Sequence, residues 1–255
     1  MRLAQENSGL ENTYEDRCPI CNDKGYIFDK LDENGCIERC DCYKQKAAQK
    51  RAQSRIEKSG LGQLLEAKTL ANFDTKRPWN KEAKELAEKF LAESNGRWFF
   101  WGGAPGCGKT HLCTAITGEF IKRGVDAKYM VWLDEIPNLK INVNDKEYSD
   151  AMHEFKTLPL LYIDDLFKSK KVEKIGKDER LVIPTTSDIR IAMELINHRV
   201  NAGLQTIISC EYTIDELVGF DVALGSRIYE QAKDFCLITD DDEGHSKNYR
   251  LWGEQ

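Results

Sequence analysis

A glycine-rich stretch, residues 103–110, has the residue types and spacing of a phosphate-binding loop. It matches G-x-x-x-x-G-K-[ST], follows the apolar run WFFW and opens a helical pattern, and this context argues against a chance glycine turn. The N–H groups of such a loop bind phosphate oxygens. Lys109 would neutralise charge on the β and γ phosphates of ATP, and the Thr110 hydroxyl would bind Mg²⁺. The predicted nucleotide-binding residues are Gly103, Ala104, Pro105, Gly106, Cys107, Gly108, Lys109, Thr110, His111 and Asp164.

Two carboxylates follow a second apolar run, LLYI, at residues 160–163. A strand there would hold Asp164 beside the phosphate loop, where it can support Mg²⁺ together with Thr110. Asp165 would then orient or deprotonate the attacking water. Because Asp is one methylene shorter than the Glu that many ATPases use at this position, we expect slow hydrolysis. The alternative is that two Asp residues merely end a strand.

Two further positions are candidates for sensing or stabilising the γ-phosphate. Glu211 follows the predicted strand 205–209, and Ser209 is the second choice for the same role. The alternative for this region is a strand end entering a helix capped by Thr213. Arg227, in LGSRIYE, could reach the ATP of a neighbouring subunit as an arginine finger, or it could be an ordinary surface residue.

Five of the nine cysteines lie within residues 18–42. Cys18 and Cys21 form C-x-x-C, Cys40 and Cys42 form C-x-C, and the hairpin-like span between them could bring four thiolates around Zn²⁺. Cys36 has a less regular spacing and is left out of this set. The alternatives are reduced cysteines without a metal, or a redox C-x-x-C, which would not need the second pair.

The elements that would position these residues alternate as in an α/β protein with a parallel sheet. Helical patterns cover residues 80–93, 109–123 and 187–202, and the first places Ala83, Ala87 and Phe90 on one face. The five predicted buried strands are Trp98–Trp101, Ala127–Trp132, Leu158–Ile163, Gln205–Ser209 and Phe235–Thr239.

Composition separates three regions: a cysteine-rich module at 1–43, a basic helix and linker at 44–65, and an α/β domain at 66–255. The net charge of −6 disfavours a dedicated binder of double-stranded DNA. No apolar run is long enough to cross a membrane, and the polar N-terminus does not read as a signal peptide, so we expect a cytoplasmic protein. The basic stretches 44–58 and 167–180 could follow a nucleic-acid backbone, or could simply be solvated surfaces.

The order of these features resembles that in the replicative helicase loaders of the DnaC/DnaI type. The features are the cysteine knuckle, the basic helix, GGAPGCGKT, LLYIDDL, the stretch Pro184–Glu211 and LGSRIYE. The resemblance covers residues 15–255 and implies an AAA+ ATPase core. It implies that the N-terminal module grips a hexameric replicative helicase, that the core binds ATP and single-stranded DNA, and that copies self-associate through the ATP site, with Arg227 acting in trans. Glu211 departs from the Asn of many relatives, and the 16 residues after the last strand leave no room for a helical lid.

Two other functions compete with helicase loading. A transposition helper ATPase would share the core motifs, but we associate the zinc knuckle with loaders. A nucleotide kinase would fit the phosphate loop but not Asp164, Asp165 and Arg227.

Overall fold

The structure is a computed structural model that describes residues 18–22, 24–31, 35–141, 145–168, 174–175, 178–179 and 184–239. Its internal contacts divide the chain into an N-terminal unit, residues 1–54, and a C-terminal unit, residues 55–255. Helix α1, Asp41–Ser59, begins in the first unit and ends in the second. The basic helix predicted from residue 44 onward is therefore present.

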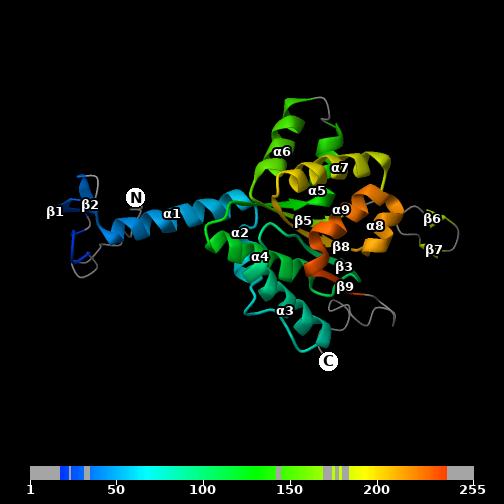
Figure 1. The fold of residues 1–255 in the computed structure, drawn as a ribbon, viewed down its shortest axis with the longest axis horizontal. Helices are drawn as coiled ribbons and strands as arrows, with labels where there is room; N and C mark the ends of the chain where they lie inside the picture. Colours follow the sequence, from blue (N-terminus) through cyan, green and yellow to red (C-terminus); the bar gives the residue numbers. More distant parts are fainter. Residues whose placement is uncertain are drawn as a thin grey trace, which may run out of the picture. The chain divides into compact units, whose positions relative to one another are not determined.

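A five-stranded sheet forms the centre of the C-terminal unit (Figure 1). Its strand order is β4-β5-β8-β3-β9, and every neighbouring pair is parallel. All five predicted strands are confirmed, with their ends shifted by a few residues. Their bounds are β3 Phe99–Gly103, β4 Ala127–Val131, β5 Leu160–Leu166, β8 Gln205–Cys210 and β9 Cys236–Thr239.

Helices cover both faces of this sheet, so that the unit has three layers (Figure 1). Successive strand residues point to opposite faces: Phe99 and Trp101 belong to one buried cluster and Phe100 to the other. The first cluster lies under α2 Gly62–Ala67, α3 Pro78–Glu93 and α4 Lys109–Lys122. The second lies under α5 Trp132–Ile141, α6 Lys146–Thr157, α7 Thr186–Asn201, α8 Ile214–Phe220 and α9 Val222–Ala232.

Two of these helices begin with reciprocal capping boxes. Thr185 and Asp188 cap α7, and Thr213 and Glu216 cap α8. Each pair satisfies backbone N–H groups that have no partner inside the helix. The Thr213 cap, given from the sequence as the alternative for this region, is present, and it fixes the direction in which the chain leaves β8. After α9, the short 3-10 helix η2, Lys233–Phe235, leads into β9.

The N-terminal unit contains a small antiparallel hairpin, in which β1 Tyr26–Leu31 pairs with β2 Ile37–Arg39. A second short antiparallel pair, β6 Lys174–Ile175 with β7 Asp178–Glu179, follows β5 in the chain. In the described parts of the chain, no helix is long and apolar enough to cross a membrane.

Part of the predicted linker is a packed helix. Gly62–Ala67 forms α2, Leu61 is fully buried, and Leu64 and Leu65 pack against the cluster under α4. The sequence indicated only a linker here, but three leucines within five residues supply enough apolar surface to pack the segment. Most of the basic stretch 167–180, and residues 240–255, on which the prediction of no lid depends, lie outside the described residues.

Candidate functional site

The phosphate loop connects the fully buried strand β3 to α4, as the sequence predicts. Gly103, Gly106 and Gly108 have φ values of +102°, +77° and +104°, a region that side chains rarely enter. At Gly103 a Cβ atom would also lie 2.2 Å from the Thr239 carbonyl oxygen of β9. The loop therefore turns where β9 approaches it, and only glycine fits at residue 103.

Lys109 folds back over this loop. Its ammonium donates to the carbonyl oxygens of Gly103 at 2.8 Å and Ala104 at 2.7 Å, and the residue is only 5% exposed. Beside the loop lies a cavity of about 230 Å³, and the loop residue Cys107 is buried. The cavity is lined by Lys68, Pro105, Gly106, Gly108, Lys109, Thr110, His111, Asp165, Lys168 and Glu211. Three ammonium groups, the loop and a helix N-terminus suit a polyphosphate.

Asp164 lies at the carboxyl end of β5, where its carboxylate accepts hydrogen bonds from four hydroxyl groups. Tyr129 and Tyr162 each donate at 2.7 Å and Thr110 at 3.1 Å, and the Ser209 hydroxyl is the fourth donor. Asp164 is 5% exposed, so these hydroxyls compensate for most of the water it has lost. Burial and the Asp164 charge raise the pKa of Tyr162 well above its usual value, which keeps its hydroxyl protonated as a donor.

The contact between Thr110 and Asp164 is also the test of whether Mg²⁺ fits. Their oxygen atoms lie 3.1 Å apart beside the phosphate cavity, and hydroxyl and carboxylate oxygens are ligands that Mg²⁺ prefers. Mg²⁺ retains waters and phosphate oxygens as its other ligands in such sites. The hydroxyl of Thr110 and the carboxylate of Asp164, the two predicted magnesium ligands, are therefore suited to Mg²⁺.

Asp165 and Glu211 do not face the cavity as free carboxylates. The Lys168 ammonium lies 2.9 Å from Asp165 Oδ2 and 2.8 Å from Glu211 Oε1. Ser209, the second choice for the sensor, accepts from the backbone N–H of Asp165 at 3.0 Å and also contacts Asp164. The structure thus brings Asp165, Ser209 and Glu211 together, and the cation that joins the two acids is a residue the sequence reasoning had not selected.

His111 lies at the cavity edge but contacts the protein. Its Nε2 is 3.1 Å from the Thr69 carbonyl oxygen and 3.0 Å from Asn72 Oδ1, and its ring packs edge-on against Phe73. Burial lowers the pKa of His111, which favours the neutral ring. Its contacts fix the segment that follows α2 against the phosphate loop.

Arg227 lies on α9, outside the residues that line the cavity of its own chain. Its guanidinium donates to the Ala223 carbonyl oxygen at 2.9 Å, one turn earlier on the same helix. The trans-acting role of Arg227 remains a prediction.

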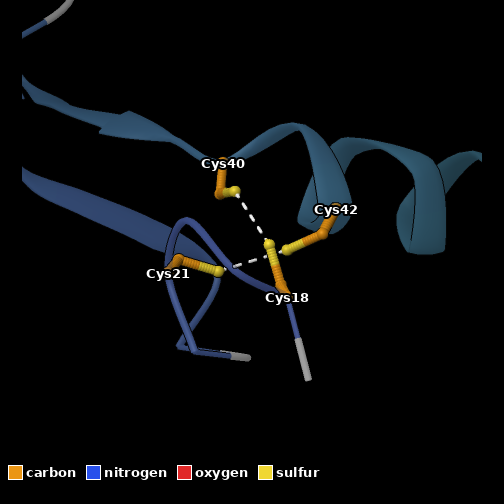
Figure 2. Close-up of side chains that lie close together, drawn as sticks. All are labelled: Cys18, Cys21, Cys40 and Cys42. Carbon is orange, nitrogen blue, oxygen red and sulfur yellow. Dashed lines mark hydrogen bonds between the residues drawn. The ribbon is translucent and has the colours of Figure 1, made fainter. Parts of the chain in front are cut away.

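In the N-terminal unit, the four predicted zinc ligands converge (Figure 2). The sulfur atoms of Cys18, Cys21, Cys40 and Cys42 all lie within 4.8 Å of one another. Cys18 Sγ is 3.7 Å from Cys40 Sγ and Cys21 Sγ is 3.2 Å from Cys42 Sγ, too far for disulfides, which need about 2.05 Å. Four thiolates each about 2.3 Å from one Zn²⁺ would lie about 3.8 Å apart, so the cluster fits that ion.

Backbone groups support this cluster. The Gly25 N–H donates to Cys21 Sγ at 3.3 Å, and backbone N–H groups of Cys21 and Ile20 lower the pKa of the Cys18 thiol to about 7. Gly25 has φ +82°, and a Cβ atom there would lie 2.9 Å from the Tyr43 ring. Cys36 is exposed and outside the cluster, in agreement with its omission.

Four residues of the nucleotide site were not predicted from the sequence: Lys68, Tyr129, Tyr162 and Lys168. The two tyrosines sit in strands whose apolar pattern indicated only core. Lys168 belongs to a basic stretch that was considered for nucleic-acid contact. Its spacing of three residues from Asp165 was the one available signal, because a turn brings such residues together.

Comparisons with known proteins agree with this site. The family model of IstB-like ATP binding proteins matches residues 33–178. The Bacillus subtilis protein YqaM is 30% identical over 224 residues, covering 84% of this chain and 66% of YqaM. The Escherichia coli replicative helicase loader DnaC is 25% identical over 162 residues, covering 62% of this chain and 64% of DnaC.

Among solved structures, the DnaC helicase loader superposes with a TM-score of 0.54 at 22% identity, covering 68% of this chain and 96% of that one. This likeness shows an AAA+ fold. The chain spans 66% of the length of YqaM and 64% of the length of DnaC. Since the family model covers more than half of the 255 residues and includes the phosphate loop and Asp164, the chain belongs to the family of IstB-like ATP binding proteins, with a DnaC-like AAA+ domain.

Proposed function

We propose that this protein is an ATP-dependent loader that binds a hexameric replicative helicase and delivers it onto single-stranded DNA. The observation that carries the proposal is the pairing, in one chain, of a nucleotide site with a four-cysteine unit that exposes apolar side chains. The first supplies a switch, and the second supplies a surface for a protein partner.

The nucleotide site contains the parts that ATP hydrolysis requires. Lys109 and the loop would hold the phosphates, Thr110 and Asp164 would hold Mg²⁺, and Asp165 would orient the attacking water. Mg²⁺ would neutralise charge on the phosphates when bound. Because Asp165 is short and is paired with Lys168, turnover would be slow, as suits an assembly switch.

The N-terminal unit has an apolar surface that its small core cannot cover. Within residues 20–43, six large apolar or aromatic side chains are exposed, and three of them, Ile20, Phe28 and Leu31, are 62–68% exposed. Exposed apolar surface of this kind marks protein-interaction sites. The unit is too small to fold on apolar burial alone, so Zn²⁺ held by the four cysteines would supply much of its folding energy.

A transposition helper acting on a transposase is the second candidate, because the matching family model is named for IstB-like proteins. That match begins at residue 33, after Cys18 and Cys21. Half of the cysteine cluster therefore lies outside the part of the chain that matches. Since we associate the cysteine knuckle with loaders, this favours the loader.

The test is capture of the replicative helicase from the cell that encodes this chain, using the tagged full-length protein with and without Mg²⁺ and ATP. A double variant, Phe28→Ser with Leu31→Ser, removes the most exposed hairpin side chains. Ile141→Ser, at a position 79% exposed in the C-terminal unit, is the matched control. We expect the wild type and the control to capture the helicase and the double variant to lose it.

Absence of capture by the zinc-loaded wild type, with and without ATP, would overturn the loader proposal. It would leave the nucleotide site in place and favour the transposition helper, which the same assay can examine with a transposase.

A further inference from the structure

Lys168 occupies a position between the two acids that face the phosphate cavity. Its ammonium lies 2.9 Å from Asp165 Oδ2 and 2.8 Å from Glu211 Oε1, and all three residues line the same cavity as Lys109 and Thr110. The Lys168 side chain is 30% exposed, and the two carboxylates are 25% and 35% exposed. The ammonium is therefore held inside the site, not on the open surface.

A strained turn puts Lys168 there. Asp165 has φ +55° and Phe167 has φ +65°, left-handed values that cost non-glycine residues free energy. Phe167 is 2% exposed and packs edge-on against Trp132 at 5.1 Å, which anchors the turn. The backbone N–H of Lys168 donates to the Asp165 carbonyl oxygen at 2.9 Å and closes the turn over the carboxylate. A turn that is both strained and anchored indicates that the position of Lys168 matters for function.

The charges decide what Glu211 can do. A carboxylate beside the γ-phosphate of ATP would be repelled by it, so Glu211 is poorly suited to bind that phosphate directly. An ammonium held by Glu211 is suited to do so. Although burial opposes its charge, the hydrogen bonds to Glu211 and Asp165 raise the pKa of Lys168, so the group is cationic when a phosphate arrives.

We propose that Lys168 is the group that contacts the γ-phosphate of bound ATP, and that Glu211 is the positioning residue that holds it. Lys168 also pairs with Asp165, the carboxylate that would bind the attacking water. When the γ-phosphate enters, it competes for the ammonium, and Asp165 is released to orient water. ADP, which has no γ-phosphate, leaves the pair closed. This inference rests on the proposed ATPase function of the same site.

The experiment measures ATP and ADP affinity separately in the full-length protein, with single-turnover hydrolysis on the same samples. Lys168→Met keeps the length of the side chain and removes its charge. We expect ATP affinity to fall about tenfold or more, the effect of one charge-assisted hydrogen bond, and ADP affinity to stay within about twofold. Hydrolysis should fall with ATP affinity, and Lys168→Arg should restore part of both. A role confined to stability would change both nucleotides equally.

Glu211 is tested with the same readout. Glu211→Ala should lower ATP affinity and hydrolysis, and should add little in the Lys168→Met background, because the two residues act as one unit. Thermal melting of each variant identifies loss of fold, and Lys168→Arg provides a variant that keeps the charge.

An unchanged ratio of ATP to ADP affinity in Lys168→Met, in a protein whose wild type binds Mg²⁺ and ATP, would overturn the role of Lys168 and leave the ATPase function intact. A wild type that binds neither nucleotide would instead overturn the proposed function itself.

Discussion

Removing a single oxygen atom at Tyr162 tests whether the hydroxyl groups around Asp164 hold that carboxylate in place. The Tyr162 hydroxyl donates to Asp164 Oδ1 at 2.7 Å, and the residue is fully buried. Tyr162→Phe keeps the ring and its packing against Tyr129, with ring centroids 5.1 Å apart, so the change leaves no large cavity.

The size of the effect follows from what Asp164 retains. A hydrogen bond to a charged group contributes about 1.5–3 kcal/mol. Because three hydroxyls still donate to the carboxylate, we expect the lower part of this range, about 1.5–2 kcal/mol of unfolding free energy. In a unit of this size, that loss lowers Tm by about 3–8 °C. Misplacing a ligand carboxylate costs about tenfold or more in metal affinity, so Mg²⁺-dependent ATP binding should weaken as well.

The assays are urea unfolding of the nucleotide-free protein, followed by tryptophan fluorescence, and titration with ATP at several Mg²⁺ concentrations. Tyr129→Phe is the matched control, because its hydroxyl donates to the other Asp164 oxygen at the same 2.7 Å from a partly exposed position. Water can replace that donor, so the loss should be smaller. If Tyr162→Phe changed neither the unfolding free energy, within about 0.5 kcal/mol, nor the Mg²⁺ dependence of ATP binding, the Tyr162 hydroxyl would not be holding Asp164 in place.

Three further predictions concern the other parts of the chain. Lys109→Ala should weaken ATP binding at least about a hundredfold, because the ammonium that would donate to both the β and the γ phosphate is lost. Lys122→Ala, an exposed change on the same helix, should leave ATP affinity unchanged, and equal affinities of the two variants in a titration would remove the phosphate-loop assignment. Cys18→Ser should lower the zinc content measured by mass spectrometry and weaken helicase capture without affecting ATP binding. Cys36→Ser, at an exposed position outside the cluster, is the control, and full zinc occupancy in Cys18→Ser would show that the cluster is misassigned. Burial lowers the pKa of His111 below its usual value of about 6.5, so the stability that its neutral ring contributes is present above pH 6.5 and is lost as the pH falls through the lowered pKa. The urea midpoint should therefore fall more steeply on acidification in the wild type than in His111→Gln, and parallel curves would contradict this.

Local patterns were enough to predict the sheet and the phosphate loop. The strand 98–101, the glycines and Lys109 are neighbours in sequence, so their spacing alone predicts how the strand, the loop and the helix follow one another. The cysteine cluster was predictable for a related reason: two closely spaced cysteine pairs joined by a short hairpin can bind one metal ion in few other ways.

The surroundings of Asp164 could not be predicted in the same way. Tyr129 lies 35 residues from Asp164 and meets it only because β4 and β5 pair in parallel, with Val131 opposite Asp164. Tyr162 and Ser209 occupy strand positions where an apolar residue would give the same secondary structure. Their hydroxyls become informative only when the register of the sheet is known.

The role of Glu211 shows a further limit. Its position at the end of β8 predicts that it faces the nucleotide, and it does line the cavity. The position of Glu211 did not predict its contact with Lys168. Lys168 follows β5 after a turn with two left-handed residues, a conformation that the sequence around Asp165 does not favour.

The proposal that this chain uses ATP to place a ring-shaped helicase on DNA can be tested with circular single-stranded DNA, which offers no end for a closed ring to thread. The measurement is the amount of cognate hexameric helicase retained on the circle after a high-salt wash, with and without this protein and ATP. We expect retention that requires both this protein and ATP and is lost in Lys109→Ala. Retention that does not depend on this protein, or no retention when helicase, protein and ATP are all present, would contradict it.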